Sequence, residues 1–172
     1  AIEAGYLVNA AGLHADRVAQ AYGFGQDCVM LPFRGSYLYG NASAPALRTH
    51  VYPVPDLGMP FLGVHFTVTV DGQVKIGPTA LPAPWREAYQ LWRQPERFSA
   101  RDLGEALGQG LRLLATNGSF RRHAVREASK LSRRRLVRHA AELVPAVTAA
   151  QFDRWGRPGI RAKLLDKRTG EL

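Results

Sequence analysis

The chain has few of the features that mark an oxidised or membrane-embedded protein. Of its 172 residues only Cys28 is a cysteine, so no internal disulfide can form and a disulfide scaffold is excluded. No run of about 18 apolar residues occurs, which argues against a membrane-spanning helix. The first residues lack the charged and apolar regions of a secretory signal peptide. They also lack an initiator methionine, so we expect the natural start to lie further upstream.

Sequence motifs of several catalytic and binding classes are absent as well. Neither CxxC nor HExxH occurs, and the five histidines lack the spacing of metal ligands, so we expect no metal site. There is no GxSxG nucleophile elbow. The GxG at 23–25 follows an expected helix and lacks the third glycine of a phosphate-binding loop. We therefore interpret Gly23 as a helix stop.

Positive charge is in excess and gathers in one segment. Lys and Arg total 23 against 14 Asp and Glu, giving a net charge of +9, and seven arginines lie between Arg121 and Arg138. This segment is either a solvated helix face or a surface for anionic phosphates or lipids. Only Phe120 offers an aromatic ring nearby and no nucleic-acid motif occurs, so we expect no nucleic-acid partner. A non-enzymatic anion-binding module stays open as an alternative function.

Hydrophobic patterning of the first half predicts an α/β fold with a mixed, largely antiparallel sheet. Residues 5–9 form a short apolar run typical of a buried parallel strand, and helical spacing follows over 13–22. Strand-like segments continue from 28 to 77, with Asp71-Gly72 as a hairpin turn. Alternation over 62–70 predicts two faces. The core face holds Val64, Phe66, Val68 and Val70, and the polar face, open to ligand or solvent, holds Gly63, His65, Thr67 and Thr69.

The second half of the chain predicts mainly helices. Ser99 to Asp102 resembles a helix start. Apolar spacing then predicts one long helix over about 120–143, ended by Pro145. Thr148 to Gln151 resembles the capping box of a short helix. Residues 159–166, within a stretch that otherwise has loop character, are expected to form a strand near the C-terminus.

Four segments, in this order and spacing, resemble a known family. They read Val-Asn-Ala-Ala-Gly-Leu-His-Ala-Asp from residue 8, Leu-Pro-Phe-Arg-Gly-Ser-Tyr from residue 31, Val-Tyr-Pro-Val-Pro-Asp from residue 51 with Phe-Leu-Gly-Val-His-Phe-Thr from residue 61, and Gly-Ile-Arg-Ala from residue 159. Together they resemble the FAD-dependent amino-acid and hydroxy-acid oxidoreductases of the D-amino-acid oxidase type. Within that family they are most similar to the branch that oxidises L-2-hydroxyglutarate, and the resemblance covers nearly the whole chain.

The resemblance implies an enzyme that oxidises L-2-hydroxyglutarate to 2-oxoglutarate by hydride transfer to FAD. Quinone or oxygen would then accept the electrons, and a related amino-acid oxidase or dehydrogenase remains an alternative. The expected location is the cytoplasm, with peripheral contact to the inner membrane left open. Members of the family begin with a GxGxxG strand–helix unit that this sequence does not contain. We therefore expect an internal piece of a longer enzyme, inactive by itself.

The same resemblance implies a division of the chain into three parts. Residues 1–27 would be a strand–helix piece of the FAD-binding domain, and 28–150 would form the substrate-binding domain. Residues 151–172 would return toward the FAD domain.

The resemblance assigns cofactor binding to a turn and suggests a catalytic base. Ala10, Ala11 and Gly12 would let the backbone approach FAD closely, although tight packing of helix against strand also explains small residues here. His65, on the polar strand face, would take the hydroxyl proton as hydride leaves the substrate, because an imidazole has a pKa near neutrality. A purely structural histidine is the other interpretation.

Substrate binding is assigned to cationic and aromatic side chains. In the family a Gly-Leu-Arg-like segment supplies the arginine that pairs with the substrate carboxylate, which implies this role for Arg161. A dianionic substrate calls for a second cation, for which Arg34 and Lys75 are candidates, each of which is otherwise a surface charge. Tyr37 and Tyr52 either line the site or are half-buried aromatics of the sheet.

Overall fold

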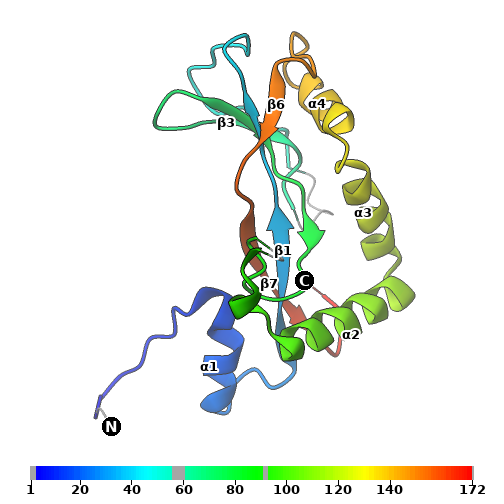
Figure 1. The fold of residues 1–172 in the computed structure, drawn as a ribbon. Helices are drawn as coiled ribbons and strands as arrows, with labels where there is room; N and C mark the ends of the chain where they lie inside the picture. The colour runs from blue at the N-terminus through cyan, green and yellow to red at the C-terminus, as the bar shows by residue number, and fades with distance from the viewer. Residues whose placement is uncertain (1–2, 56–60, 91–92, 172) are drawn as a thin grey trace.

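A computed structural model describes residues 3–55, 61–90 and 93–171 and shows helices packed on two antiparallel sheets (Figure 1). The predicted mixture of helices and largely antiparallel sheet is confirmed. The helices are α1 (Ala15–Ala21), α2 (Ala100–Thr116), α3 (Gly118–Ser129) and α4 (Arg133–Ala141), with short 3-10 turns η1 (Gly12–His14) and η3 (Pro95–Arg97). The strands are β1 (Cys28–Gly35), β2 (Leu38–Gly40), β3 (His65–Val68), β4 (Val74–Gly77), β5 (Leu81–Pro82), β6 (Phe152–Trp155) and β7 (Gly159–Asp166).

The two sheets are joined end to end by short connections. One sheet has the strand order β5-β1-β7 and the other β3-β4-β2-β6. β1 and β7 pair over their whole length, from Cys28 opposite Asp166 to Gly35 opposite Gly159. The chain passes from one sheet to the other at residues 36–37, 78–80 and 156–158. Side chains from these three crossings therefore meet at the sheet junction.

Each sheet buries one face against helices. On the four-stranded sheet, α4 covers the apolar face, and α2 crosses one end of the β1–β7 pair (Figure 1). The first core contains Leu38, Val64, Phe66, Val74, Ile76, Leu136, Val137, Ala140, Val147 and Phe152. The second contains Val29, Leu31, Phe33, Leu113, Phe120 and Leu165. No described helix covers the opposite face of the four-stranded sheet, which carries the polar side chains discussed below.

Several locally encoded features are as predicted. Asp71-Gly72 turns the β3–β4 hairpin, with Gly72 at a φ of +74°. The side chain of Ser99 caps α2 by accepting a hydrogen bond from the backbone N–H of Asp102. The predicted alternation holds for Val64 and Phe66, which are buried, but Val70 lies beyond the strand and is fully exposed.

The predicted parallel strand over residues 5–9 is wrong. These residues form no strand, and Tyr6 and Val8 are exposed to 87% and 76%. A buried parallel strand needs hydrogen-bonded neighbours along its length. None of the described strands pairs with this segment.

The predicted single helix over 120–143 is two helices. Lys130 ends α3 and Ser132, in an extended conformation, begins α4. Lys130 is 4% exposed and forms an ion pair with Glu127. Glu127 also accepts a hydrogen bond from the backbone N–H of Ala80 at 2.8 Å. The chain turns where this buried pair anchors it to the sheet junction.

The predicted helix after Thr148 is also absent, and a turn occupies its place. The side chain of Gln151 accepts a hydrogen bond from the backbone N–H of Thr148 at 2.8 Å. Its amide nitrogen also donates to the carbonyl of Ser43 at 2.9 Å. The capping contact forms, but the remaining backbone leads directly into β6 instead of a helix.

Candidate functional site

A pocket of about 200 Å³ lies at the junction of the two sheets. It is enclosed by residues from β1, from β7 and from the crossing after β4. Its lining is Phe33, Gly35, Tyr37, Phe61, Pro78, Thr79, Ala80, Gly159, Ile160 and Arg161. Two of the predicted site residues, Tyr37 and Arg161, thus share one pocket wall although 124 positions separate them in the sequence.

Gly77 allows Tyr37 to sit at this junction. A Cβ added to Gly77 would lie 2.8 Å from the carbonyl oxygen of Ser36 and 2.9 Å from the Tyr37 ring. The φ of Gly77 is +144°, which side-chain-bearing residues rarely adopt. The strand therefore passes against the Tyr37 ring only with glycine at this position.

His65 lies next to Tyr37 and beneath Tyr52. The rings of His65 and Tyr52 stack with centroids 4.3 Å apart, and the Tyr37 ring meets His65 edge-on at 6.4 Å. This aromatic cover leaves His65 only 5% exposed. His65 is on the predicted strand face, but that face is shielded here and not open to solvent.

The hydrogen bond of His65 determines which ring nitrogen can act as a base. Its Nδ1 lies 3.0 Å from the carbonyl oxygen of Gly63. A carbonyl oxygen only accepts hydrogen bonds, so we assign the proton to Nδ1. Nε2 of the neutral ring then carries a free lone pair. Nε2 is the atom that can take a proton from a substrate.

Burial and neighbouring charges keep this imidazole neutral. Burial lowers the pKa of His65 below its usual value of 6.5, and the positive charges of Arg161 and Lys75 lower it further, against the opposing effect of the Gly63 hydrogen bond. Burial raises the pKa of Tyr37, although Arg161 opposes the change. At neutral pH the site therefore presents a neutral base and a protonated phenol in a positive electrostatic field.

The lowered pKa of His65 makes stability depend on pH. Between the folded-state pKa and about 6.5 the unfolded chain binds a proton that the folded chain does not, so acidification favours unfolding. We expect the free energy of unfolding to fall as the pH is lowered from about 7.5 to 5. Urea titrations across this range measure the slope, and in His65→Asn the slope should be smaller. An equal slope in the variant would assign the pH dependence to other groups.

Arg161 carries a guanidinium with no carboxylate partner among the residues that the structure describes. It stands opposite Phe33 in the β1–β7 pair and is exposed at the pocket. Lys75 stands opposite both Tyr39 and Thr67 and so shares the helix-free face with His65. Its Nζ lies 4.5 Å from the centroid of the Tyr37 ring.

The structure does not bring Arg34 to this site. Arg34 follows Phe33 on β1 and pairs with Ile160, so its side chain projects from the opposite face of the sheet to Arg161. It lines a separate pocket with Ser36, Thr79, Leu81, Leu131, Trp155 and Gly156. Burial there lowers its pKa. Of the two candidates for a second cation, only Lys75 is near His65.

The Ala10–Gly12 turn leads into η1, which contacts both β1 and β7. The backbone N–H of Ala11 donates to the side chain of Asn9, and a Cβ added to Gly12 would meet nothing within 4 Å. Gly12 has a φ of +53°. The turn is thus open to a ligand from outside.

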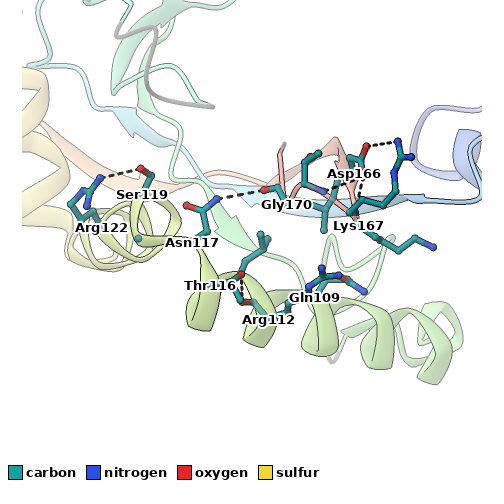
Figure 2. A pocket seen from close by; sticks show the side chains of 14 residues that line it. Gln109, Arg112, Thr116, Asn117, Ser119, Arg122, Asp166, Lys167 and Gly170 are labelled. Carbon is teal, nitrogen blue, oxygen red and sulfur yellow. Dashed lines mark hydrogen bonds and ion pairs between the residues drawn. The ribbon is translucent and has the colours of Figure 1, made fainter.

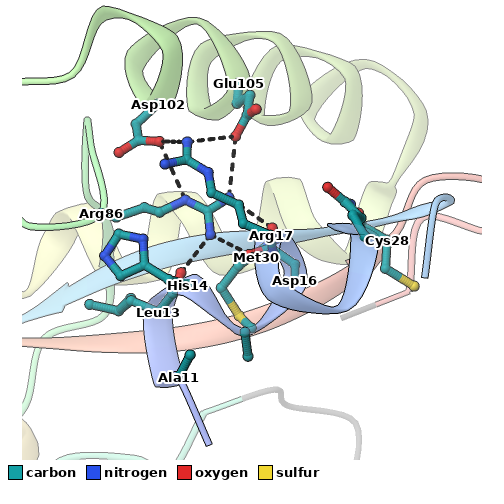
Figure 3. Close-up of polar contacts among 12 residues, drawn as sticks. Ala11, Leu13, His14, Asp16, Arg17, Cys28, Met30, Arg86, Asp102 and Glu105 are labelled. Carbon is teal, nitrogen blue, oxygen red and sulfur yellow. Dashed lines mark hydrogen bonds and ion pairs between the residues drawn. The ribbon is translucent and has the colours of Figure 1, made fainter. Parts of the chain in front are cut away.

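A buried ion network holds this turn in place, and the sequence pattern did not reveal it (Figure 3). Arg86 is 1% exposed and binds both carboxylate oxygens of Asp16. It also donates to the carbonyl oxygen of Leu13, directly after the turn. Its Nε lies 3.3 Å from Asp102, and Arg17 binds the same carboxylate.

Asp16 joins this network to β1. Its Oδ2 accepts the backbone N–H of Met30 at 2.8 Å. Burial by itself would raise the pKa of Asp16, but the bonds from Arg86 and Met30 outweigh it and hold the pKa below its usual value. The turn, α1, β1 and α2 are thereby fastened to one buried guanidinium.

A larger pocket of about 420 Å³ lies between the α2–α3 junction and the segment after β7 (Figure 2). Its cations are mostly engaged by their own neighbours. Arg122 donates to Ser119, Lys167 donates to the carbonyl of Gln26, and Arg168 pairs with Asp166 and Asp27. These contacts make it a weaker anion site than the sheet junction.

The described residues hold neither a metal cluster nor a membrane-spanning helix. No group of three or more His, Cys, Asp or Glu side chains is placed to hold a metal ion. No described helix is both long and apolar enough to cross a bilayer.

Comparison with known proteins gives the family. The family described as "FAD dependent oxidoreductase" matches residues 1–170. The chain belongs to this FAD-dependent oxidoreductase family. Proteins named L-2-hydroxyglutarate dehydrogenase are similar to it. The mitochondrial one of Bos taurus is 37% identical over 97% of this chain, that of Nematostella vectensis 38% over 99%, and one of Escherichia coli 33% over 95%.

This member of the FAD-dependent oxidoreductases spans only about a third of the length of those relatives, with 35%, 36% and 38% of their chains covered. The resemblance drawn from the four segments is confirmed at the level of the family and of the named relatives. The roles of individual residues and the division into three parts remain predictions. Asp56, the last residue of the Val-Tyr-Pro-Val-Pro-Asp segment, lies outside the described residues.

Proposed function

We propose that this chain forms part of an enzyme that oxidises L-2-hydroxyglutarate to 2-oxoglutarate with FAD as hydride acceptor. The observation that carries the proposal is the buried imidazole of His65, on which the described cations Arg161 and Lys75 act but no described carboxylate does. Such a site suits an anionic substrate from which a proton must be removed. The names of the similar proteins support the choice of substrate.

The reaction removes two hydrogens from the substrate. The C2 hydrogen leaves as hydride, which FAD, when bound, accepts. The hydroxyl proton goes to Nε2 of His65. The hydrogen bond that Nδ1–H donates to the carbonyl oxygen of Gly63 stabilises the imidazolium that forms. Arg161 holds the carboxylate next to the reacting carbon with two parallel hydrogen bonds. Tyr52 and Tyr37 keep water from the base.

The Ala10–Gly12 turn fits the close approach of a dinucleotide. Nothing lies within 4 Å of the position that a Gly12 side chain would take, so a ligand can approach the backbone there. We assign cofactor contact to Ala10, Ala11 and Gly12 on this ground. Arg86 positions the turn through the Leu13 carbonyl.

Electron transfer to quinone or oxygen is part of the same proposal, as is a cytoplasmic protein in peripheral contact with an anionic membrane. The arginines of α3 and α4 between Arg121 and Arg138 are all exposed, next to the exposed apolar Val125 and Leu131. A basic surface with apolar side chains can adsorb to anionic lipid. An exposed basic face also suits contact with water alone. It therefore supports membrane contact only together with electron transfer to a quinone in the membrane.

Anaerobic mixing of the complete, FAD-loaded gene product with L-2-hydroxyglutarate tests the proposal. The flavin absorbance should bleach with this substrate, and 2-oxoglutarate should form in equal amount. The D enantiomer serves as control and should leave the flavin oxidised. An oxidised flavin with both enantiomers would contradict the proposed reaction.

Arg161→Lys should raise KM for L-2-hydroxyglutarate at unchanged FAD content. Lysine keeps the charge but loses the bidentate fork, and a charge-assisted hydrogen bond contributes about 1.5–3 kcal/mol, or roughly 10- to 100-fold in affinity. Steady-state kinetics measure the effect, with Arg157→Lys as a control on a nearby surface arginine. A change in KM below about threefold would remove Arg161 from the carboxylate site.

A further inference from the structure

We infer that Lys75 recognises the second, distal carboxylate of the substrate and so makes the site selective for dicarboxylic 2-hydroxy acids. This inference rests on the proposed function. It assigns to one side chain a preference that the reaction itself does not require, since oxidation at C2 needs only the first carboxylate and the hydroxyl group.

The β-sheet register places Lys75 on the catalytic face. Lys75 pairs with Tyr39 on β2 and with Thr67 on β3, two residues from His65. Paired residues of antiparallel strands project to the same side, as do residues two apart in one strand. Lys75 and His65 therefore share the face that no helix covers.

Aromatic rings hold the Lys75 ammonium in position. Its Nζ lies 4.5 Å from the centroid of the Tyr37 ring and 5.9 Å from that of Tyr39. Contact with ring faces partly desolvates the ammonium and fixes the long side chain, which lowers the entropy lost when a ligand binds. Lys75 is thus more ordered than an ordinary surface lysine.

The charge of Lys75 has no anionic counterpart within the described part of the chain. The other three lysines each contact a group of the fold: Lys130 pairs with Glu127, Lys167 donates to a carbonyl, and Lys163 lies over the Phe61 ring. The positive charge of Lys75 instead lowers the pKa of His65, together with that of Arg161. A half-buried cation beside a neutral base is complementary to a carboxylate that the substrate brings.

The two cations come from different sheets, and both lie near Tyr37. Arg161 lies on β7 and lines the junction pocket with Tyr37, and Lys75 reaches the same ring from β4. A substrate with a carboxylate at each end can engage one cation with each. Arg34 cannot serve as the second cation because it projects from the other face of its sheet.

Selectivity between a diacid and a monoacid of equal length tests the inference. In the complete holoenzyme, the dissociation constants of 2-oxoglutarate and 2-oxopentanoate are measured from the perturbation of the flavin spectrum, and kcat/KM is measured with the two corresponding L-2-hydroxy acids. Lys75→Met should raise the dissociation constant of 2-oxoglutarate about 10- to 100-fold, the effect of losing one charge-assisted hydrogen bond. The dissociation constant of 2-oxopentanoate should change less than about twofold. Lys75→Arg should restore most of the diacid affinity.

Arg154→Met is the matched control. Arg154 pairs with Tyr39 in the same sheet, and its guanidinium lies 5.3 Å from that ring, but it is exposed and donates to Gln73. The Arg154→Met substitution should leave the ratio of the dissociation constants of 2-oxoglutarate and 2-oxopentanoate unchanged. If Lys75→Met weakened the binding of both acids equally, or of neither, the inference would be overturned. Because binding is measured separately, a holoenzyme that binds the diacid selectively but never reduces its flavin would contradict the proposed reaction and still support Lys75.

Discussion

Replacing His65 with asparagine should lower the rate of flavin reduction by about 10²- to 10⁴-fold in the complete, FAD-loaded protein, the range expected for loss of a general base. Asparagine can retain a hydrogen bond to the Gly63 carbonyl but has no group that takes a proton near neutral pH. Substrate affinity should change little, because Arg161 is untouched. Stopped-flow bleaching of the flavin measures the step directly.

The pH profile distinguishes catalysis from structure at His65. In the wild-type protein the rate should fall on acidification below a pKa that lies under the usual 6.5, because burial and the nearby cations lower it. The variant should lack this acidic limb. His50→Asn is the matched control: His50 accepts the backbone N–H of Val68 at 3.0 Å and packs edge-on against Tyr52, but it has no assigned proton transfer. A normal reduction rate in folded His65→Asn would return His65 to a structural role.

Arg86→Met should lower the free energy of unfolding more than any of the other proposed substitutions. The substitution leaves the buried carboxylates of Asp16 and Asp102 without their shared guanidinium, and breaking a buried ion pair from one side costs about 3–5 kcal/mol. Urea unfolding of the full chain at pH 7 measures the difference in the free energy of unfolding. Arg97→Met is the control, since its pair with Glu87 is about 40% exposed on both sides and should contribute under about 1 kcal/mol.

A second variant tests the origin of this effect. In Asp16→Asn combined with Arg86→Met, the uncompensated charge at Asp16 is gone, so the double variant should recover part of the stability lost in Arg86→Met. Proteolysis after Leu13 should become faster in Arg86→Met, because the carbonyl of Leu13 loses its donor. A loss below about 1 kcal/mol in Arg86→Met would show that water replaces the guanidinium.

Features encoded in adjacent residues were predicted well. The Asp71-Gly72 hairpin, the Ser99 cap and the strand Gly159–Asp166 each depend on the backbone preferences of a few consecutive residues. The long helix failed at Lys130 for the opposite reason. Helical periodicity continues across that position, but the contacts that turn the chain come from Glu127 and, through it, from the distant Ala80.

The same contrast, between features of adjacent residues and contacts of distant ones, applies to the family assignment and to the site. Four short segments, in their order and spacing, indicated the FAD-dependent oxidoreductase family, because each segment spans only a few adjacent residues. The sequence also identified His65 and Arg161 as chemically suitable side chains. It could not choose between Arg34 and Lys75, since both are single cations next to a strand.

Only the tertiary structure distinguishes these two residues, because the face of a strand depends on which strand pairs with it and in what register. Pairing of β1 with β7 turns Arg34 away from Arg161, and pairing of β4 with β2 and β3 places Lys75 beside His65. The structure likewise brings Asp16 to Arg86 across 70 positions. The sequence by itself determined which groups can carry charge and protons, and folding determined which of them meet, since contacts between distant segments depend on the packing of the whole chain.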